Sequence, residues 1–245
     1  MLGYLKNGLI AGLSGGLAAA LFMVTFGRGP INDAIALENS AATKVEAGHV
    51  HEDLFTRGVQ EIGGAIGLLV FGIGIGLIFA VVLGATAPLL GTRHPFGASL
   101  RLGALGFWSV VVIPFLKLPA NPPAVGDPDT INQRTILYFA VLAASIALTV
   151  FVAQLIHRST RSAVATGWIA AIVYTVGLVA IFAVFPDNPD AVTAPADLIW
   201  RFRLSSLGAL ASLWAAVTLA MGTLMERQAR IDAGQIAGAA APAAR

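Results

Sequence analysis

The chain has 245 residues, of which 57% are hydrophobic and only 11% are charged, and its formal net charge is +2. A soluble domain usually carries about 25% charged residues, so this chain has too few to cover the surface of a water-soluble globule of its size. The composition therefore excludes a soluble enzyme and indicates that lipid surrounds much of the protein. The small net charge, without a basic run that contains aromatic residues, argues against a nucleic-acid partner, and the absence of cysteine excludes thiolate metal sites.

Six stretches are long and apolar enough to span a bilayer, whose hydrocarbon core of about 30 Å needs about 20 helical residues. They are predicted at roughly 8–27, 62–90, 102–118, 136–156, 163–185 and 204–225. The third is the weakest, because Pro114 interrupts it and Lys117 closes it, and a five-span chain would lack this helix or merge it with another. We expect an all-α polytopic membrane bundle over residues 1–227, followed by a disordered tail at 228–245.

Charge placement predicts how the spans are oriented. The short connections at 91–101 and 157–162 hold four arginines, Arg93, Arg101, Arg158 and Arg161. Because Lys and Arg in short loops stay on the cytoplasmic side, we place both termini and the tail in the cytoplasm of a bacterial cell, with the chain in the inner membrane. Three longer, acidic loops then face outward.

A short motif occurs twice between predicted helices. Pro119-Ala-Asn-Pro-Pro-Ala-Val125 returns in the same register as Pro186-Asp-Asn-Pro-Asp-Ala-Val192, and a degraded third copy begins at Pro30. We interpret the motif as the mark of a duplicated helical hairpin, which predicts three outward-pointing hairpins with an internal repeat.

The first outer loop contains a candidate metal site. His49 and His51 are two residues apart, so in an extended chain both imidazoles point to the same side, and Glu52 or Asp53 supplies a carboxylate. Such nitrogen and oxygen donors suit Co, Ni, Zn or Cu(II). The alternative is a solvated polar loop without a ligand.

The two motif loops are a candidate path for ions. Their amides and carboxylates would supply oxygen ligands and concentrate cations. The residues concerned are Asn121, Asp127, Asp129, Asp187, Asn188 and Asp190. The alternative is structural, because Asn-Pro sequences form turns and Asp caps helices.

The remaining motifs and residues concern enzymatic activity and further metal ligands. No phosphate-binding Gly-Lys-Ser/Thr motif and no arguable Ser/His/Asp set occur, so we expect no enzyme and no cofactor. His94 and His157 lie at the predicted inner side, where a metal exit relay competes with simple capping. Met221 and Met225 share a helix face, where soft metal ligands compete with core packing.

Several stretches resemble the cobalt transporter subunit CbtA family. They are Leu5-Lys-Asn-Gly-Leu-Ile-Ala-Gly12, His49-Val-His-Glu52, Leu118-Pro-Ala-Asn-Pro-Pro-Ala-Val-Gly-Asp127 and Trp200-Arg-Phe-Arg-Leu-Ser-Ser-Leu207. The resemblance implies cobalt import linked to cobalamin biosynthesis, and a small single-helix partner that carries histidines. It also implies five spans, against the six counted above.

The sequence therefore predicts a membrane transporter subunit for a divalent transition metal, with Co²⁺ as the transported ion. In this hypothesis His49 and His51 capture the ion outside and the acidic loops lead it to the helices. The alternatives are a membrane scaffold that transports nothing and a membrane-embedded enzyme that acts on lipids or quinones.

Overall fold

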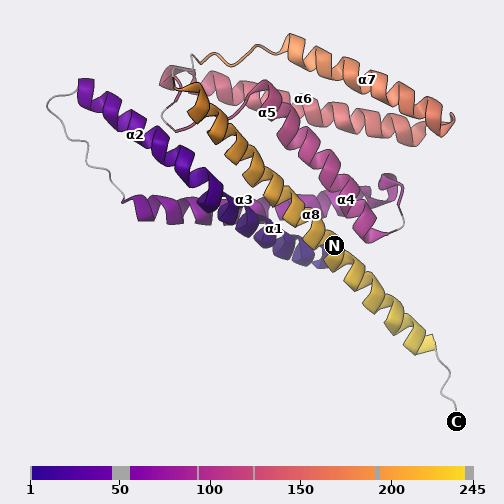
Figure 1. The fold of residues 1–245 in the computed structure, drawn as a ribbon. Helices are drawn as coiled ribbons and strands as arrows, with labels where there is room; N and C mark the ends of the chain where they lie inside the picture. The colour runs from indigo at the N-terminus through magenta and orange to yellow at the C-terminus, as the bar shows by residue number, and fades with distance from the viewer. Residues whose placement is uncertain (1, 46–55, 93, 124, 191–193, 241–245) are drawn as a thin grey trace. The chain divides into compact units, whose positions relative to one another are not determined.

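The computed structural model describes residues 2–45, 56–92, 94–123, 125–190 and 194–240, and these residues form helices without a strand. The elements in chain order are α1 (Leu2–Phe22), the π-helical turn η1 (Met23–Gly27), α2 (Arg28–Val45), α3 (Arg57–Thr86), η2 (Ala87–Leu90), α4 (Pro95–Gly106), the π-helical turn η3 (Phe107–Val112), α5 (Ile113–Lys117), η4 (Pro128–Thr130), α6 (Ile131–Arg158), α7 (Ala163–Val184) and α8 (Ala196–Ala240), drawn in Figure 1. The all-α prediction is confirmed.

Six stretches of the described chain are long and apolar enough to cross a membrane. They are Leu2–Ser40, Arg57–Leu90, Pro95–Lys117, Ile131–Arg158, Ala163–Val184 and Ala196–Gly234. The prediction of six helices long and apolar enough to span a membrane is confirmed, and the weak third stretch is one of them. The three-hairpin repeat stays a prediction. Its degraded third copy lies inside α2, whereas the described residues of the two clear copies are not helical.

Proline interrupts two spans, and in both the helix continues through a π-helical turn. Pro114 follows η3, where the backbone N–H of Ile113 already donates to the carbonyl of Trp108. The next carbonyl, that of Ser109, would need the N–H that Pro114 lacks. The Ser145 hydroxyl of α6 donates to this carbonyl instead, at 2.5 Å, and Ser145 is fully buried.

In the first span, a serine hydroxyl from another helix also satisfies the carbonyl that proline leaves without a donor. Pro30 has no N–H for the carbonyl of Phe26, four residues earlier in the turn η1. The Ser205 hydroxyl of α8 donates to that carbonyl at 3.1 Å. The helix therefore passes the proline and extends to Val45, beyond the end predicted at residue 27.

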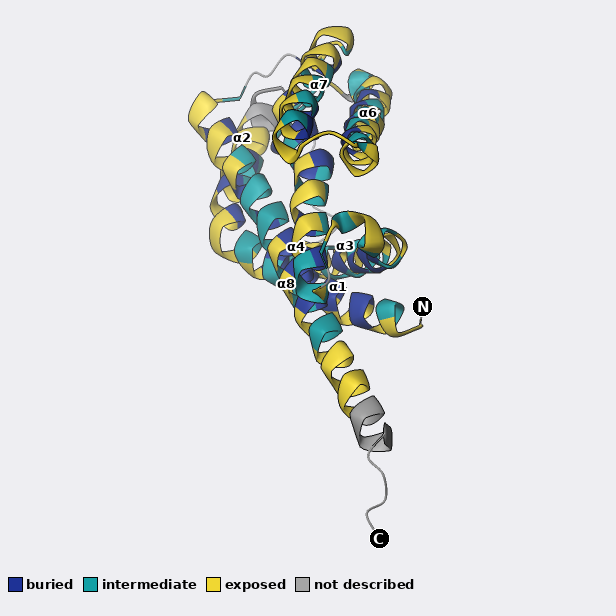
Figure 2. Cartoon of the chain, turned by 90° about the vertical axis from the view of Figure 1, so that its right-hand side faces the viewer, coloured by how far each residue is buried: buried dark blue, intermediate teal, exposed yellow. Residues whose placement is uncertain are grey.

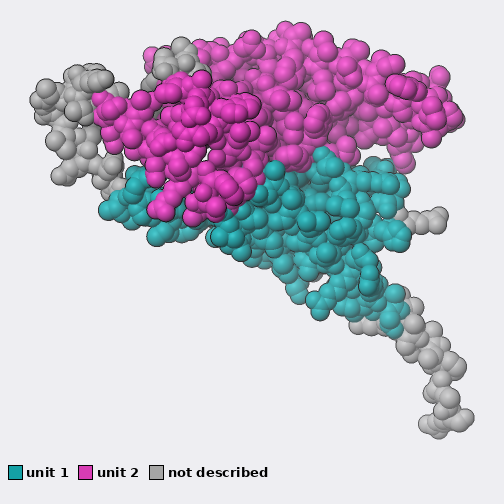
Figure 3. Space-filling view, in the orientation of Figure 1, with its two compact units in different colours: residues 1–21, 55–104, 209–245 teal, residues 22–54, 105–208 magenta. Residues whose placement is uncertain are grey.

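The chain divides into two compact units, coloured in Figure 3. Unit 1 consists of Met1–Leu21, Phe55–Ala104 and Ala209–Arg245, and unit 2 of Phe22–Leu54 and Leu105–Gly208. Each unit has its own packed interior.

In unit 1, glycines allow α1 and α3 to pack with their backbones in contact. A Cβ atom added at Gly12 would lie 2.5 Å from the carbonyl oxygen of Gly72, and one at Gly16 would lie 2.7 Å from that of Leu68. Only glycine permits this approach, and small residues at a helix contact allow close packing in a membrane. The half of α8 in unit 1 contributes the fully buried side chains of Leu213, Val217 and Met221, and α3 contributes that of Leu83.

In unit 2, α6 and α7 pack antiparallel around Leu137, Val141 and Ile181. Much of α7 is exposed, as Figure 2 shows. Its exposed residues recur at helical spacing, with Val164, Trp168, Ile172, Val176 and Val179 each at least 60% exposed. An apolar helix face without protein cover is the face that a transmembrane helix presents to lipid.

Helix α8 continues past residue 227, where the predicted bundle ends, and is helical to Ala240. Two pairs spaced four residues apart support this extension: Arg230 lies 2.7 Å from Glu226, and the amide of Gln228 donates to Asp232 at 3.0 Å. Alanine, frequent in this segment, has the highest helix propensity. The disordered tail itself stays a prediction.

Candidate functional site

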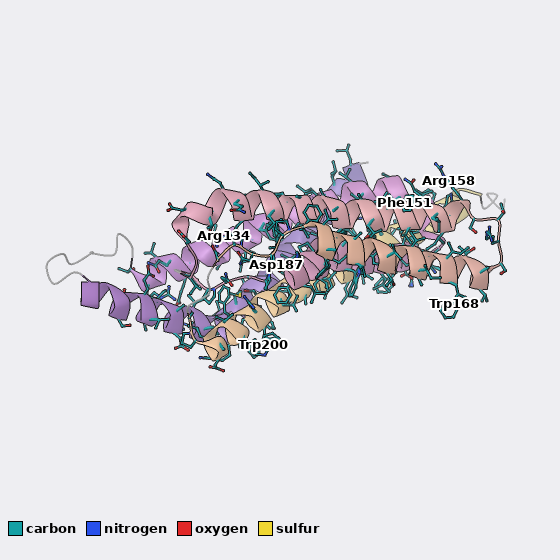
Figure 4. The ribbon with its side chains drawn as sticks, turned by 90° about the horizontal axis from the view of Figure 1, so that it is seen from above. Arg134, Phe151, Arg158, Trp168, Asp187 and Trp200 are labelled. Atoms are coloured by element: carbon teal, nitrogen blue, oxygen red, sulfur yellow. The ribbon has the colours of Figure 1, made fainter. Side chains whose placement is uncertain are left out.

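The two motif loops and the helix ends beside them lie at one end of unit 2. In Figure 4, Arg134 and Asp187 lie toward this end, while Arg158 and Trp168 lie toward the other end of the α6–α7 pair. These loops and the segment that follows the first one contain all six residues predicted to form an ion path. We define the loop cluster as residues 117–134 and 186–190 together with Arg203, because ion pairs and hydrogen bonds link these segments.

Asp190 is the centre of the loop cluster. Its side chain is fully buried and lies 2.6 Å from Nη1 of Arg134, which follows the first turn of α6. The Thr130 hydroxyl and, at 3.4 Å, the backbone N–H of Asp127 both donate to Oδ1 of Asp190. This one carboxylate therefore joins the second motif loop to the segment that follows the first.

A glycine makes room for this ion pair. Gly126 has φ +133°, a conformation that favours glycine. A Cβ atom at this position would lie 2.7 Å from Oδ2 of Asp190 and 2.9 Å from Nη1 of Arg134. The backbone can approach the two charges only because residue 126 has no side chain.

A buried lysine also joins the loops. Lys117, at the end of α5, has a side chain only 6% exposed, and its Nζ lies 2.5 Å from the exposed carboxylate of Asp187. The same Nζ donates to the carbonyl of Phe182 at 3.1 Å and lies 5.9 Å from the centre of its ring. The ammonium group is thus compensated on several sides, as a buried cation requires.

Arg203 of α8 holds the first motif loop. Its Nη2 donates to the side-chain oxygen of Asn121 at 3.0 Å, and its Nε donates to the carbonyl of Ala120 at 3.2 Å. Arg203 therefore binds the first loop from the helix that follows the second loop, and Arg134 binds the second loop from the helix that follows the first.

Local turns account for two more of the predicted residues. The carboxylate of Asp127 accepts from the N–H of Asp129 at 2.9 Å, and the amide oxygen of Asn188 accepts from the N–H of Asp190 at 3.1 Å. Both are the side-chain-to-backbone bonds two residues apart that stabilise turns.

The geometry divides the predicted ion-path residues into two groups. Asn121 and Asp190 hold the loops to other segments, and Asn188 stabilises a turn within its own loop. Asp127, Asp129 and Asp187 remain exposed to solvent. Lys117, Arg134 and Arg203 were not predicted as members of the cluster, because the residues they bind across the loops lie between 56 and 83 positions away in the chain. Their positive charge among the acidic residues of the predicted outer segments was the available signal. Ion conduction by this cluster stays a prediction.

The other predicted site, His49, His51, Glu52 and Asp53, lies outside the described residues. Within the residues that the structure does describe, no three His, Asp or Glu side chains lie close enough together to share a metal ion. The capture of metal by the first loop therefore also stays a prediction.

One family model matches most of the chain. Neither curated proteins nor solved structures give a match. The family model described as "Probable cobalt transporter subunit (CbtA)" matches residues 2–226, which include all six spans except the end of α8. The chain therefore belongs to the CbtA family of probable cobalt transporter subunits.

Proposed function

We propose that the protein is the membrane subunit of a cobalt importer in a bacterial inner membrane, and that the Co²⁺ it admits is used in cobalamin biosynthesis. The family match over residues 2–226 is the observation that carries the proposal. Six apolar spans with exposed apolar faces support it, since a transporter must cross the bilayer.

In this proposal the first outer loop captures the ion. Two imidazoles and a neighbouring carboxylate, from His49, His51 and Glu52 or Asp53, form a donor set that suits Co²⁺. Both termini lie in the cytoplasm, so this loop faces outward. A single-helix partner subunit that carries histidines completes the transporter.

The loop cluster has two roles in the proposal. The exposed carboxylates of Asp127, Asp129 and Asp187 raise the local concentration of cations. The buried pair of Asp190 and Arg134 keeps the two motif loops together and contributes no net charge.

Uptake of radiolabelled Co²⁺ tests the proposal. Cells that express the gene together with its partner should accumulate more Co²⁺ than cells without it, and excess Ni²⁺ or Zn²⁺ measures the selectivity. The double variant His49→Ala/His51→Ala should reduce uptake at limiting Co²⁺, whereas His157→Ala, at the end of α6, should not. Equal uptake with and without the gene would contradict transport and favour a scaffold, while normal uptake by the double variant would contradict capture by the loop.

A further inference from the structure

Unit 1 contains a pocket of about 240 Å³ near the first residues of α1. Tyr4 of α1, Leu83 of α3 and Met225 of α8 line it, together with Thr92 and His94 from the connection that leads into α4. A water molecule occupies about 30 Å³ of liquid volume, so the pocket has room for a small ion with several water molecules.

The pocket presents a specific set of donors. His94 supplies an imidazole, Met225 a thioether, and Tyr4 and Thr92 supply hydroxyl groups. Among the described residues that line it, none carries a carboxylate. Imidazole and thioether groups are neutral ligands of intermediate and soft character, which suit transition metals and not Mg²⁺ or Ca²⁺.

Hydrogen bonds fix the elements that carry the two metal ligands. The N–H of His94 donates to the Thr92 hydroxyl at 3.3 Å. The carbonyl of His94 accepts from the N–H of Ala98 at 3.0 Å, which is the first helical hydrogen bond of α4 and fixes His94 directly before Pro95. On the other wall, the buried amide of Asn7 donates to the sulfur of Met225 at 3.4 Å. A thioether sulfur has two lone pairs, so one remains for another partner.

The position of the pocket follows from the packing of α1 against α3. Gly8 lies against Gly76, and Gly16 lies against Leu68, so the two helices are antiparallel and the start of α1 meets the end of α3. The segment that contains His49 leads into the start of α3. With 30 residues, α3 is about 45 Å long at 1.5 Å per residue, so the pocket lies at the opposite end of this helix.

We propose that this pocket is a second binding site for a divalent transition-metal ion, with His94 and Met225 as its protein ligands. The proposal rests on the proposed function for the direction of transport, in which the pocket lies on the cytoplasmic side. With two neutral protein ligands and water in the remaining positions, the site binds the ion weakly. Weak binding suits release of the ion into the cytoplasm. The first outer loop, which adds a carboxylate to two imidazoles, suits tighter binding and capture.

Equilibrium dialysis of the purified protein in detergent against radiolabelled Co²⁺ tests the site. The double variant His49→Ala/His51→Ala serves as the background, since it removes binding at the outer loop. On this background His94→Gln should weaken Co²⁺ binding by at least about tenfold, because even the loss of a group that only supports a ligand costs 10–100-fold. His157→Gln is the matched control and should leave binding unchanged.

A second pair of variants tests the thioether. Met225→Leu keeps an apolar side chain of similar size but removes the sulfur, and should also weaken Co²⁺ binding. Met221→Leu, one turn earlier in α8 and fully buried, removes a sulfur that does not line the pocket and should have no effect. Thermal unfolding of each variant identifies any that is misfolded.

The possible results separate this proposal from the proposed function. Equal Co²⁺ binding by the His94→Gln and His157→Gln proteins overturns the second site, even if cells import Co²⁺ through the outer loop. Loss of binding in the His94→Gln protein upholds the site, even if uptake in cells shows no dependence on the gene.

Discussion

The ion pair of Asp190 and Arg134 makes a quantitative prediction. In the variant Asp190→Asn the side chain keeps its shape but loses its charge, and its NH₂ group faces the donors of Arg134 if its oxygen keeps the bond to Thr130. Removal of one partner from a buried pair costs about 3–5 kcal/mol. The Arg134 side chain is 28% exposed, so water relieves part of this cost, and we expect a loss of about 2–3 kcal/mol in unfolding free energy.

Thermal unfolding in detergent measures this loss. For a chain of this size about 1 kcal/mol corresponds to 2–4 °C, so the Tm of Asp190→Asn should fall by roughly 4–12 °C. Asp129→Asn makes the same chemical change at an exposed site of the same cluster and should shift the Tm little. The double variant Asp190→Asn/Arg134→Gln should recover part of the loss, because no charge is left unpaired. Equal Tm values for the two single variants would refute the assignment of Asp190 as the link between the loops.

Three further variants test the packing, with thermal unfolding as the measurement. Ser145→Ala leaves the buried carbonyl of Ser109 without its donor and should cost about 1–3 kcal/mol; an unchanged Tm would mean that the π-helical turn needs no such donor. Gly12→Ala places a methyl group against the backbone of α3 and should lower the Tm, whereas Gly74→Ala, where nothing lies within 4 Å, should keep or raise it because Ala favours helix; the same shift in both would contradict the close packing. Gly126→Ala should lower the Tm through its φ of +133° and its collision with the buried ion pair, and a neutral effect would contradict that geometry.

The number and type of the helices could be predicted from the sequence, because apolar length is a local property and the bilayer sets its threshold. The helix ends could not. The first span is predicted to end at residue 27, before Pro30, and proline usually ends a helix. Pro30 lies inside a continuous helix because a π-helical turn precedes it and Ser205, far along the chain, satisfies the carbonyl that proline leaves free.

The composition of the loop cluster could be predicted, but its pairing could not. The sequence shows acidic residues and arginines in the same outward segments, and a local count of charge cannot tell which ones meet. Asp190 and Asp129 look alike in sequence, as carboxylates that follow an Asn-Pro motif. One is buried against Arg134 and the other is exposed, and this difference depends on how the chain packs across more than fifty residues.

This difference changes what the acidic loops can do for a cation. A carboxylate buried beside an arginine contributes almost no potential to the solvent, whereas an exposed one acts over about 8–10 Å at physiological salt. In the proposed function, the attraction of ions at the loop cluster therefore depends on Asp127, Asp129 and Asp187. The ion pair with Lys117 offsets the charge of Asp187. Neutralising Asp127 and Asp129 should then lower Co²⁺ uptake most at low ionic strength and without loss of Tm, while Asp190→Asn should lower the Tm at any salt concentration. Measurement of uptake at two salt concentrations, beside the Tm, separates attraction of the ion from the stability of the loops that carry the charges.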